Sequence, residues 1–157
     1  MQSIDQLLHD QPFFAELGES TVELLAGCAM NTHAAPGDLL FSEGQPADRF
    51  FLLRHGRVAL EVHRPGTRPL VIDTADDGDV VGWSWLIPPY RWLFDARVVE
   101  PTRAVVFDAQ CMRDKCDADP AVGYALLQRV TQVMYTQLQS ARIRLVDVYG
   151  VPDDVVG

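Results

Sequence analysis

The sequence is poor in positive charge, in cysteine and in long apolar runs. Lysine and arginine total 13 of 157 residues against 22 aspartates and glutamates, so the net charge is -9. A domain that binds nucleic acid by itself usually presents a basic face, and this balance argues against a nucleic-acid partner. No apolar run reaches the roughly 18 residues of a membrane span, and no basic stretch precedes an apolar one at the N-terminus. We therefore expect a cytoplasmic protein with no membrane partner.

The cysteines and histidines give no sign of a reactive or metal centre. Cys28, Cys111 and Cys116 make an odd count, which favours free thiols over a set of disulfides. An iron–sulfur cluster normally needs four thiolates, and the four histidines are dispersed along the chain. No nucleophile elbow, phosphate-binding P-loop or His-Glu-x-x-His motif occurs. We expect no metal, no cofactor and no enzymatic activity.

The sequence does have a β-rich middle between two helical ends. A chain of 157 residues that is 48% hydrophobic fits one globular domain with its own core. Apolar residues on both sides of Pro12 predict an N-terminal helix. Ser20 and Glu23 have the spacing of a capping box, which predicts a second helix with Ser20 as its N-cap and an end near Gly27.

The middle of the chain has the composition of short strands. Val58, Leu60 and Val62 alternate with more polar residues, the period-2 pattern of a half-buried strand. Glycine-containing turns separate the segments at intervals of roughly 8–12 residues, which is typical of a sandwich or barrel. The predicted strands are 32–34, 39–42, 49–53, 57–63, 70–74, 96–100 and 102–108.

The C-terminal part predicts two helices. Asp108 is suited to cap a helix through Lys115, and Asp119-Pro120 opens a helix to Tyr149 of roughly 45 Å. One apolar seam has the 3-4 spacing of a packed helix and comprises Leu127, Val130, Met134, Leu138, Ala141, Leu145 and Val148. A second stripe, able to cover the strands, comprises Val122, Leu126 and Val133. The seam either packs against a second copy, giving the homodimer that we favour, or folds back over its own strands.

Five short motifs occur in order and resemble a known family. They are Phe14-Ala-Glu-Leu, Pro36-Gly-Asp, Phe41-Ser-Glu-Gly, the stretch 50–58 with Gly56-Arg-Val, and Gly78-Asp-Val-Val-Gly. Over roughly residues 5–150 the chain resembles the cyclic-nucleotide-binding domain, which includes the sensor half of catabolite-activator-type regulators.

The resemblance implies an α+β fold. Its centre is a cyclic-nucleotide-binding-like β-roll (a double-stranded β-helix or jelly roll), with N-terminal helices and a long C-terminal helix. We expect one domain over 1–150, a dimerisation helix at about 120–149 and a tail at 151–157. The few residues after Tyr149 are too short for a helix-turn-helix, so we expect no DNA-binding domain in this sequence.

The sequence departs from that family where its members hold the nucleotide. The family has Glu after the second glycine, for the ribose, where this chain has Trp83. It then has Arg and a small residue, for the phosphate, where this chain has Phe94 and Asp95; Arg97 takes the later Ser or Thr position. Losing both charged groups would remove several kcal/mol, at roughly 1.5–3 kcal/mol per charged hydrogen bond. Binding of cAMP through the usual contacts is therefore not expected.

All three tryptophans lie in this same stretch, so we take it as the candidate ligand-binding pocket. Its candidate residues are Gly82, Trp83, Ser84, Trp85, Arg91, Trp92, Asp95 and Arg97. The aromatic rings either line a pocket for a flat or apolar ligand, or plug the cavity and pack the loop. Asp95 and Arg97 either pair with each other or leave an arginine free for an anion.

Three functions are consistent with these observations. The first is a regulatory sensor or adaptor module with a degenerate phosphate loop, which responds to an unusual small molecule or to none and passes its output to a protein partner. The second is a true cyclic-nucleotide receptor that uses Arg97 or Arg91 on the phosphate and Ser84 on the ribose. The third is a purely structural interaction module whose own aromatic rings fill the cavity.

Overall fold

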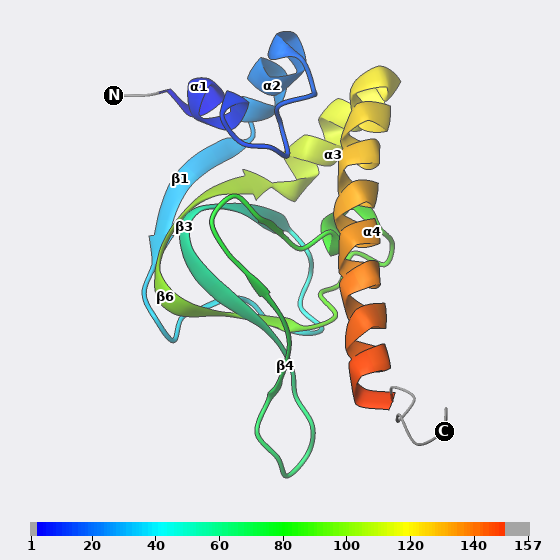
Figure 1. The fold of residues 1–157 in the computed structure, drawn as a ribbon. Helices are drawn as coiled ribbons and strands as arrows, with labels where there is room; N and C mark the ends of the chain where they lie inside the picture. Colours follow the sequence, from blue (N-terminus) through cyan, green and yellow to red (C-terminus); the bar gives the residue numbers. More distant parts are fainter. Residues whose placement is uncertain (1–2, 150–157) are drawn as a thin grey trace.

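The chain forms a β-roll with helices at both of its ends, in a computed structural model that describes residues 3–149 (Figure 1). The helices α1 and α2 lie beside α3 at one end of the roll, and α4 runs alongside the strands. This confirms the α+β architecture and the long C-terminal helix that the sequence predicts. The elements are α1 (Ile4–His9), α2 (Glu19–Ala26), β1 (Ala29–Ala34), β2 (Leu39–Phe41), β3 (Arg49–Val62), β4 (Leu70–Ala75), β5 (Val80–Val81), the 3-10 helix η1 (Ser84–Leu86), β6 (Asp95–Asp108), α3 (Ala109–Ala118) and α4 (Pro120–Tyr149).

Two long strands form the centre of the roll. The strand order is β1-β6-β3-β4, with β2 paired to β6 and β5 paired to β3, and every pairing is antiparallel. The sequence predicts two strands in place of β3 and two in place of β6, and both divisions are wrong. Gly56 has φ +130°, and a Cβ there would lie 2.3 Å from Thr102 Oγ1. The glycine therefore lets β3 bend while its pairing with β6 continues beyond a shift of register.

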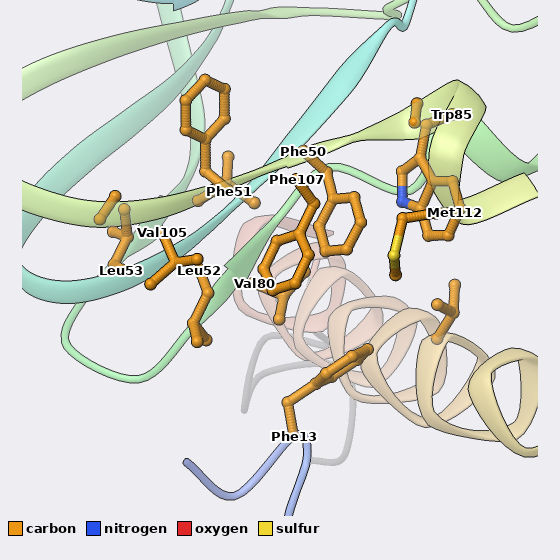
Figure 2. Close-up of a cluster of buried hydrophobic side chains, with 14 of the residues drawn as sticks. Phe13, Phe50, Phe51, Leu52, Leu53, Val80, Trp85, Val105, Phe107 and Met112 are labelled. Carbon is orange, nitrogen blue, oxygen red and sulfur yellow. The ribbon is translucent and has the colours of Figure 1, made fainter. Parts of the chain in front are cut away.

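A stack of aromatic rings joins the strands to the N-terminal segment (Figure 2). The Phe50 ring of β3 lies between Trp85 and Phe107, with centroid distances of 4.6 Å and 4.5 Å. Phe107 of β6 stacks in turn on Phe14, 5.4 Å away. All four side chains are fully buried. The stack therefore ties four distant parts of the sequence into one core.

The helix starts at Asp108 and Asp119 and the helix end at Gly27 agree with the sequence, whereas α3 continues past its predicted end at Lys115 to Ala118. Asp108 accepts a hydrogen bond from Cys111 N at 2.8 Å, and Asp119 accepts one from Ala121 N at 3.2 Å, so α3 and α4 begin as expected. Gly27 caps the end of α2. The prediction of Ser20 as N-cap is wrong, because α2 begins at Glu19 after Gly18, whose φ of +84° suits glycine.

The two apolar stripes of α4 have different environments. Val122 and Leu126 are buried against the rest of the domain, as the second stripe predicts, and Val133 is half-buried. Val130, which we placed in the seam, is also buried there. The seam residues Leu127, Ala141, Leu138, Leu145 and Val148 are exposed, and Met134 is half-buried. Most of the seam therefore does not fold back over its own strands.

The expectation of free thiols is wrong for two of the three cysteines. Cys28 and Cys111 form a disulfide, and Cys116 is free. The bond follows from the strand register, because Ala29 pairs with Phe107 and so brings the residue before β1 beside the first turn of α3. The two cysteines are 83 positions apart, and a count of cysteines cannot reveal such a contact.

None of the helices in the described part of the chain has the length and apolar character needed to cross a membrane. The predicted tail at 151–157 lies outside the described residues.

Replacing Phe50 with alanine removes the middle ring of the stack. We expect Phe50→Ala to lower the free energy of unfolding by about 3–5 kcal/mol, the usual cost of deleting a buried phenylalanine. Urea unfolding followed by circular dichroism measures this loss. Met30→Ala, at an exposed position, is the control and should change stability by less than about 0.5 kcal/mol. A loss below about 1 kcal/mol in Phe50→Ala would show that the stack is not central to the core.

Candidate functional site

The connection between β5 and β6, residues 82–94, is packed tightly against the roll; we call it the β5–β6 loop. Gly82 has φ +90°, and a Cβ there would lie 2.4 Å from Cζ3 of Trp92. The Trp92 ring also stacks on Phe41, with centroids 3.7 Å apart and an interplanar angle of 11°. The indole thus contacts both the Gly82 backbone and a phenyl ring, and no side chain fits at position 82 without displacing it.

The three tryptophans of the loop have different environments. Trp85 and Trp92 are buried in the core, and Trp85 Nε1 has no hydrogen-bond partner among the described residues. Trp83 is half-buried and lies in a groove of about 540 Å³ against α4, which we call the Trp83 groove. Its lining from the helix comprises Thr131, Met134, Tyr135, Gln137 and Leu138. Two of the rings therefore pack the interior, and the third packs against α4.

The loop is also fastened from outside. Arg91 is exposed and donates a hydrogen bond to the Gly44 carbonyl at 3.2 Å. Arg113 of α3 donates to the Trp85 carbonyl at 2.6 Å, and its guanidinium lies 4.6 Å from the centre of the Tyr90 ring. Ser84 begins η1 and is buried.

The charged residues at the start of β6 pair with β3 and not with each other. Arg97 donates two hydrogen bonds to the Glu61 carboxylate, both at 2.9 Å, and Glu61 raises the pKa of Arg97 above its ordinary value. Asp95 accepts a hydrogen bond from Glu43 N at 2.7 Å and contacts His63 Nε2 at 2.5 Å. The predicted Asp95–Arg97 pair is therefore wrong.

Strand geometry explains both the error and the direction in which these groups point. Residues at positions i and i+2 of one strand lie on the same face, but each of them is closer to its neighbour on the adjacent strand than to the other. Ala96 is opposite Leu60, and Asp95 is opposite Glu61, in the register of β3 and β6. Because successive side chains alternate, the ion pairs lie on the face of the strands opposite to Leu60 and Ala96. Sequence reasoning missed Glu61 and His63, although their alternation with Val62 was visible.

A second space next to the long helix lies between β4 and α4. This β4–α4 cavity has a volume of about 410 Å³. The strands contribute Leu60, Asp73, Thr74, Ala75 and Val80, and the turn before β5 contributes Asp79. The helix α4 contributes Arg129, Gln132, Val133, Thr136, Gln137 and Ser140. Within the described residues, none of the eight candidate residues lines it. The structure therefore separates the predicted loop site from the open cavity.

The polar lining of the β4–α4 cavity is mainly acidic or neutral. Burial raises the pKa of Asp79, and nearby carboxylates add to the rise. A hydrogen bond from Asp76 N lowers this pKa but does not offset the effect of burial. Arg129 is the cation among the described lining residues. It donates to the carbonyls of Phe13 and Pro12 at 2.8 Å and 2.9 Å, so its guanidinium is engaged by the N-terminal segment.

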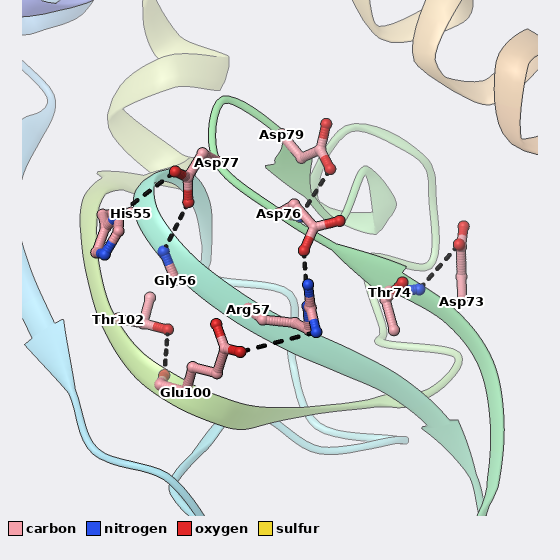
Figure 3. Close-up of polar contacts among 10 residues, drawn as sticks. All are labelled: His55, Gly56, Arg57, Asp73, Thr74, Asp76, Asp77, Asp79, Glu100 and Thr102. Atoms are coloured by element: carbon pink, nitrogen blue, oxygen red, sulfur yellow. Dashed lines mark hydrogen bonds and ion pairs between the residues drawn. The ribbon is translucent and has the colours of Figure 1, made fainter.

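The acidic turn beside the cavity, residues 76–79, is anchored to the bend in β3 (Figure 3). Asp77 accepts a hydrogen bond from Gly56 N at 2.8 Å, which lowers the pKa of Asp77. Asp76 contacts Arg57 at 2.9 Å. Asp76 and Asp77 are thus neutralised or hydrogen-bonded by β3. Asp79 of the same turn and Asp73 of β4 line the cavity. No group of three or more potential ligands in the described residues is placed to hold a metal ion.

The roll, the loop that closes it and the adjoining long helix define a regulatory or sensor domain fold. The sequence profile of the cyclic nucleotide-binding domain matches residues 31–119, more than half of the chain. The chain therefore belongs to the cyclic nucleotide-binding domain family.

Comparison with individual proteins agrees with this assignment. The chain is 28% identical over 138 residues to the HTH-type transcriptional regulator Cmr of Mycobacterium tuberculosis (strain CDC 1551 / Oshkosh), which covers 88% of this chain. It spans about half, 54%, of the length of that relative. A crystal structure from Geobacter metallireducens GS-15, described as a cyclic nucleotide-binding protein, has a TM-score of 0.78 and 26% identity over 88% of this chain and 99% of that one.

A third similar structure is a regulatory subunit of a cAMP-independent protein kinase A from Trypanosoma brucei. It is a triple mutant bound to cAMP in its A site. The TM-score is 0.72 and the identity 14%, over 89% of this chain and 49% of that one. At this identity the likeness concerns the fold alone.

Two glycines allow the packing around Trp92 to be tested. We expect Gly82→Ala to lower the free energy of unfolding by about 2–5 kcal/mol, because backbone strain at positive φ adds to a clash with the indole. Gly44→Ala is the matched control, since Gly44 has φ +83° but no atom within 4 Å of the added Cβ. It should lose only about 1–2 kcal/mol. Urea unfolding measures both, and equal losses would show that Trp92 does not depend on a glycine at position 82.

Proposed function

We propose that this chain is a regulatory sensor or adaptor module that does not hold a cyclic nucleotide through the contacts usual in its family. The observation that carries the proposal is the pair Phe94-Asp95, which occupies the positions of the phosphate-binding arginine and the small residue after it. Phe94 is buried beside Phe41, with centroids 5.8 Å apart. A phosphate would therefore meet an apolar ring and a neighbouring carboxylate in place of a guanidinium.

Electrostatics supports this proposal. Recognition of phosphate by proteins favours the planar fork of arginine, whose charged hydrogen bonds are about twice as strong as neutral ones. Asp95 is buried and already bonded to Glu43 N and His63. Bringing an anion close to it costs Coulomb energy without gaining a partner.

The alternative of a true receptor needs a substitute arginine, and the contacts of both candidates weigh against it. Arg97 makes two hydrogen bonds with Glu61, on the face of the strands away from Leu60 and the β4–α4 cavity. Arg91 is held by Gly44 at the outer surface of the loop. A similar fold occurs in the regulatory subunit of a protein kinase A described as cAMP-independent, whose triple mutant has cAMP bound in its A site, so the fold does not by itself decide whether cAMP binds.

Titration with cAMP and cGMP tests the proposal directly. We expect isothermal titration calorimetry on the wild-type protein to detect no saturable binding of either nucleotide up to about 1 mM. A Kd of about 1 mM corresponds to a binding free energy of roughly -4 kcal/mol. Saturable micromolar binding that Arg97→Ala or Arg91→Ala abolishes would overturn the proposal in favour of the receptor. Native mass spectrometry of the same sample distinguishes a bound small molecule, as in a sensor, from an empty interaction module.

A gain of binding gives the complementary control. The triple variant Trp83→Glu, Phe94→Arg, Asp95→Ser restores the family's residue types at its ribose and phosphate positions. A gain of cAMP affinity in a variant that still unfolds cooperatively would indicate that these three positions account for the loss. Trp83→Glu alone should not restore binding, because the family's phosphate-binding position, residue 94, would still lack an arginine.

We also propose that the module is a homodimer through α4 and that its output goes to a protein partner. The exposed seam supports this proposal, because Leu138 and Leu145 are 50% and 56% exposed on a helix whose buried residues lie in its first half. A second copy would remove this apolar surface from water, and two-fold dimers are the commonest oligomers.

A charge placed in the seam should separate such a dimer. We expect Leu138→Glu to reduce the mass measured by sedimentation equilibrium from two chains to one, because two like charges would face each other in an apolar interface. Gln128→Glu, an exposed position away from the seam, is the matched control and should stay dimeric. A wild-type protein that remains monomeric at about 100 μM would contradict the dimer, because a dimer with a Kd of about 1 μM would be almost fully formed at that concentration.

A further inference from the structure

The disulfide between Cys28 and Cys111 links the connection before β1 to α3, two segments that lie far apart in the sequence. Cys28 lies between α2 and β1, and Cys111 lies in the first turn of α3, with their Cα atoms 5.7 Å apart. Asp108 N donates to the Cys28 carbonyl at 2.9 Å, so the backbone is aligned at the same point. The bond therefore fastens the start of α3 to the N-terminal part of the chain.

The two cysteines differ in exposure. Cys28 is only 6% exposed, and Cys111 is half-buried. Both belong to the wall of an open groove of about 970 Å³ between α2 and α3, which also includes Leu24, Met30, Asp114 and Lys115. Because Cys111 is the more exposed of the two, it is the better candidate for first attack by a reagent in this α2–α3 groove.

We propose that this disulfide is a reversible thiol-exchange site, entered at Cys111, that controls how firmly α3 is held. The co-reactant is a thiol, of low molecular weight or a protein dithiol. Its thiolate attacks Cys111 Sγ, a new S–S bond forms there, and Cys28 leaves as a thiolate that takes a proton. A second thiolate then attacks the sulfur of the bound reagent and releases Cys111 as a thiolate. In total, two thiols are oxidised to one disulfide and the protein gains two thiol groups.

The position of α3 gives this exchange a structural effect. On one side α3 packs on α4, where a Cβ on Gly123 would lie 3.2 Å from Cys116 Cβ. On another side Arg113 holds the β5–β6 loop through the Trp85 carbonyl and the Tyr90 ring. Opening the disulfide removes the covalent attachment to the N-terminal part and leaves α3, α4 and the loop connected to one another. This effect does not depend on which ligand the domain binds.

Cys116 is an internal control for the exchange. Burial, with the nearby charge of Asp117, raises the pKa of the Cys116 thiol. Since the thiolate is the reactive form, Cys116 should exchange and alkylate slowly at neutral pH.

The test uses the wild-type protein prepared without reductant. Alkylation of the native protein, followed by mass spectrometry, should find the Cys28–Cys111 bond intact. Brief treatment with glutathione should place the mixed disulfide on Cys111, with at least tenfold less on Cys28 or Cys116. Full reduction should lower Tm by roughly 10 °C and raise hydrogen exchange in α3 at least tenfold, with little change in β3.

Single variants separate the site from a general loss of stability. Each single variant leaves one free thiol, so its partner in the exchange is oxidised glutathione, whose S–S bond is attacked by the protein thiolate with release of one reduced glutathione. Cys28→Ser leaves the more exposed cysteine and should form this adduct quickly, whereas Cys111→Ser leaves the buried one and should react slowly. Cys116→Ser should behave as wild type. A native protein with three free thiols, an adduct mainly on Cys28, or the same α3 exchange before and after reduction of the wild type would each overturn the proposal. None of these outcomes bears on the binding of cyclic nucleotides.

Discussion

The stacking of Phe50 between Trp85 and Phe107 is the contact on which the rest of the domain depends. It joins β3, β6 and the β5–β6 loop, and through Phe14 it reaches the N-terminal segment. Aromatic contacts of this kind combine a large buried area with a preferred geometry. The loop is therefore part of the hydrophobic core, and its shape is set by packing as well as by any ligand.

The charges near the loop follow from the same constraint. With Ala96 and Val98 buried in the interior, Asp95 and Arg97 must point to the other face. Their partners there are Glu61 of β3 and His63, which follows the end of β3. Each partly buried charge thus has an opposite charge or a hydrogen bond beside it, which avoids the cost of burying it alone. Polar groups open to a ligand also line the β4–α4 cavity, on a different side of the strands.

Local signals made much of the fold predictable. Helix starts at Asp108 and Asp119 depend on neighbours within three residues, and the sequence contains them. Contacts between distant segments could not be predicted in this way: the disulfide and the Glu61–Arg97 pair depend on strand register. Val130 was misplaced because a step of three residues leaves it roughly 60° around the helix from Leu127, on the side of Leu126 and Val133. In the candidate site, the sequence located the aromatic loop, but only the packing could tell which rings are interior.

All three tryptophans of the chain lie in the β5–β6 loop, and their surroundings differ. Trp85 and Trp92 are shielded from water by stacked rings, and Trp83 lies at the edge of α4. Tryptophan fluorescence of this protein therefore comes from a single segment, with two indole rings in an apolar environment and one at a boundary with solvent. The chain carries its own optical reporter for any movement of the loop against the long helix, and no label is needed to read it.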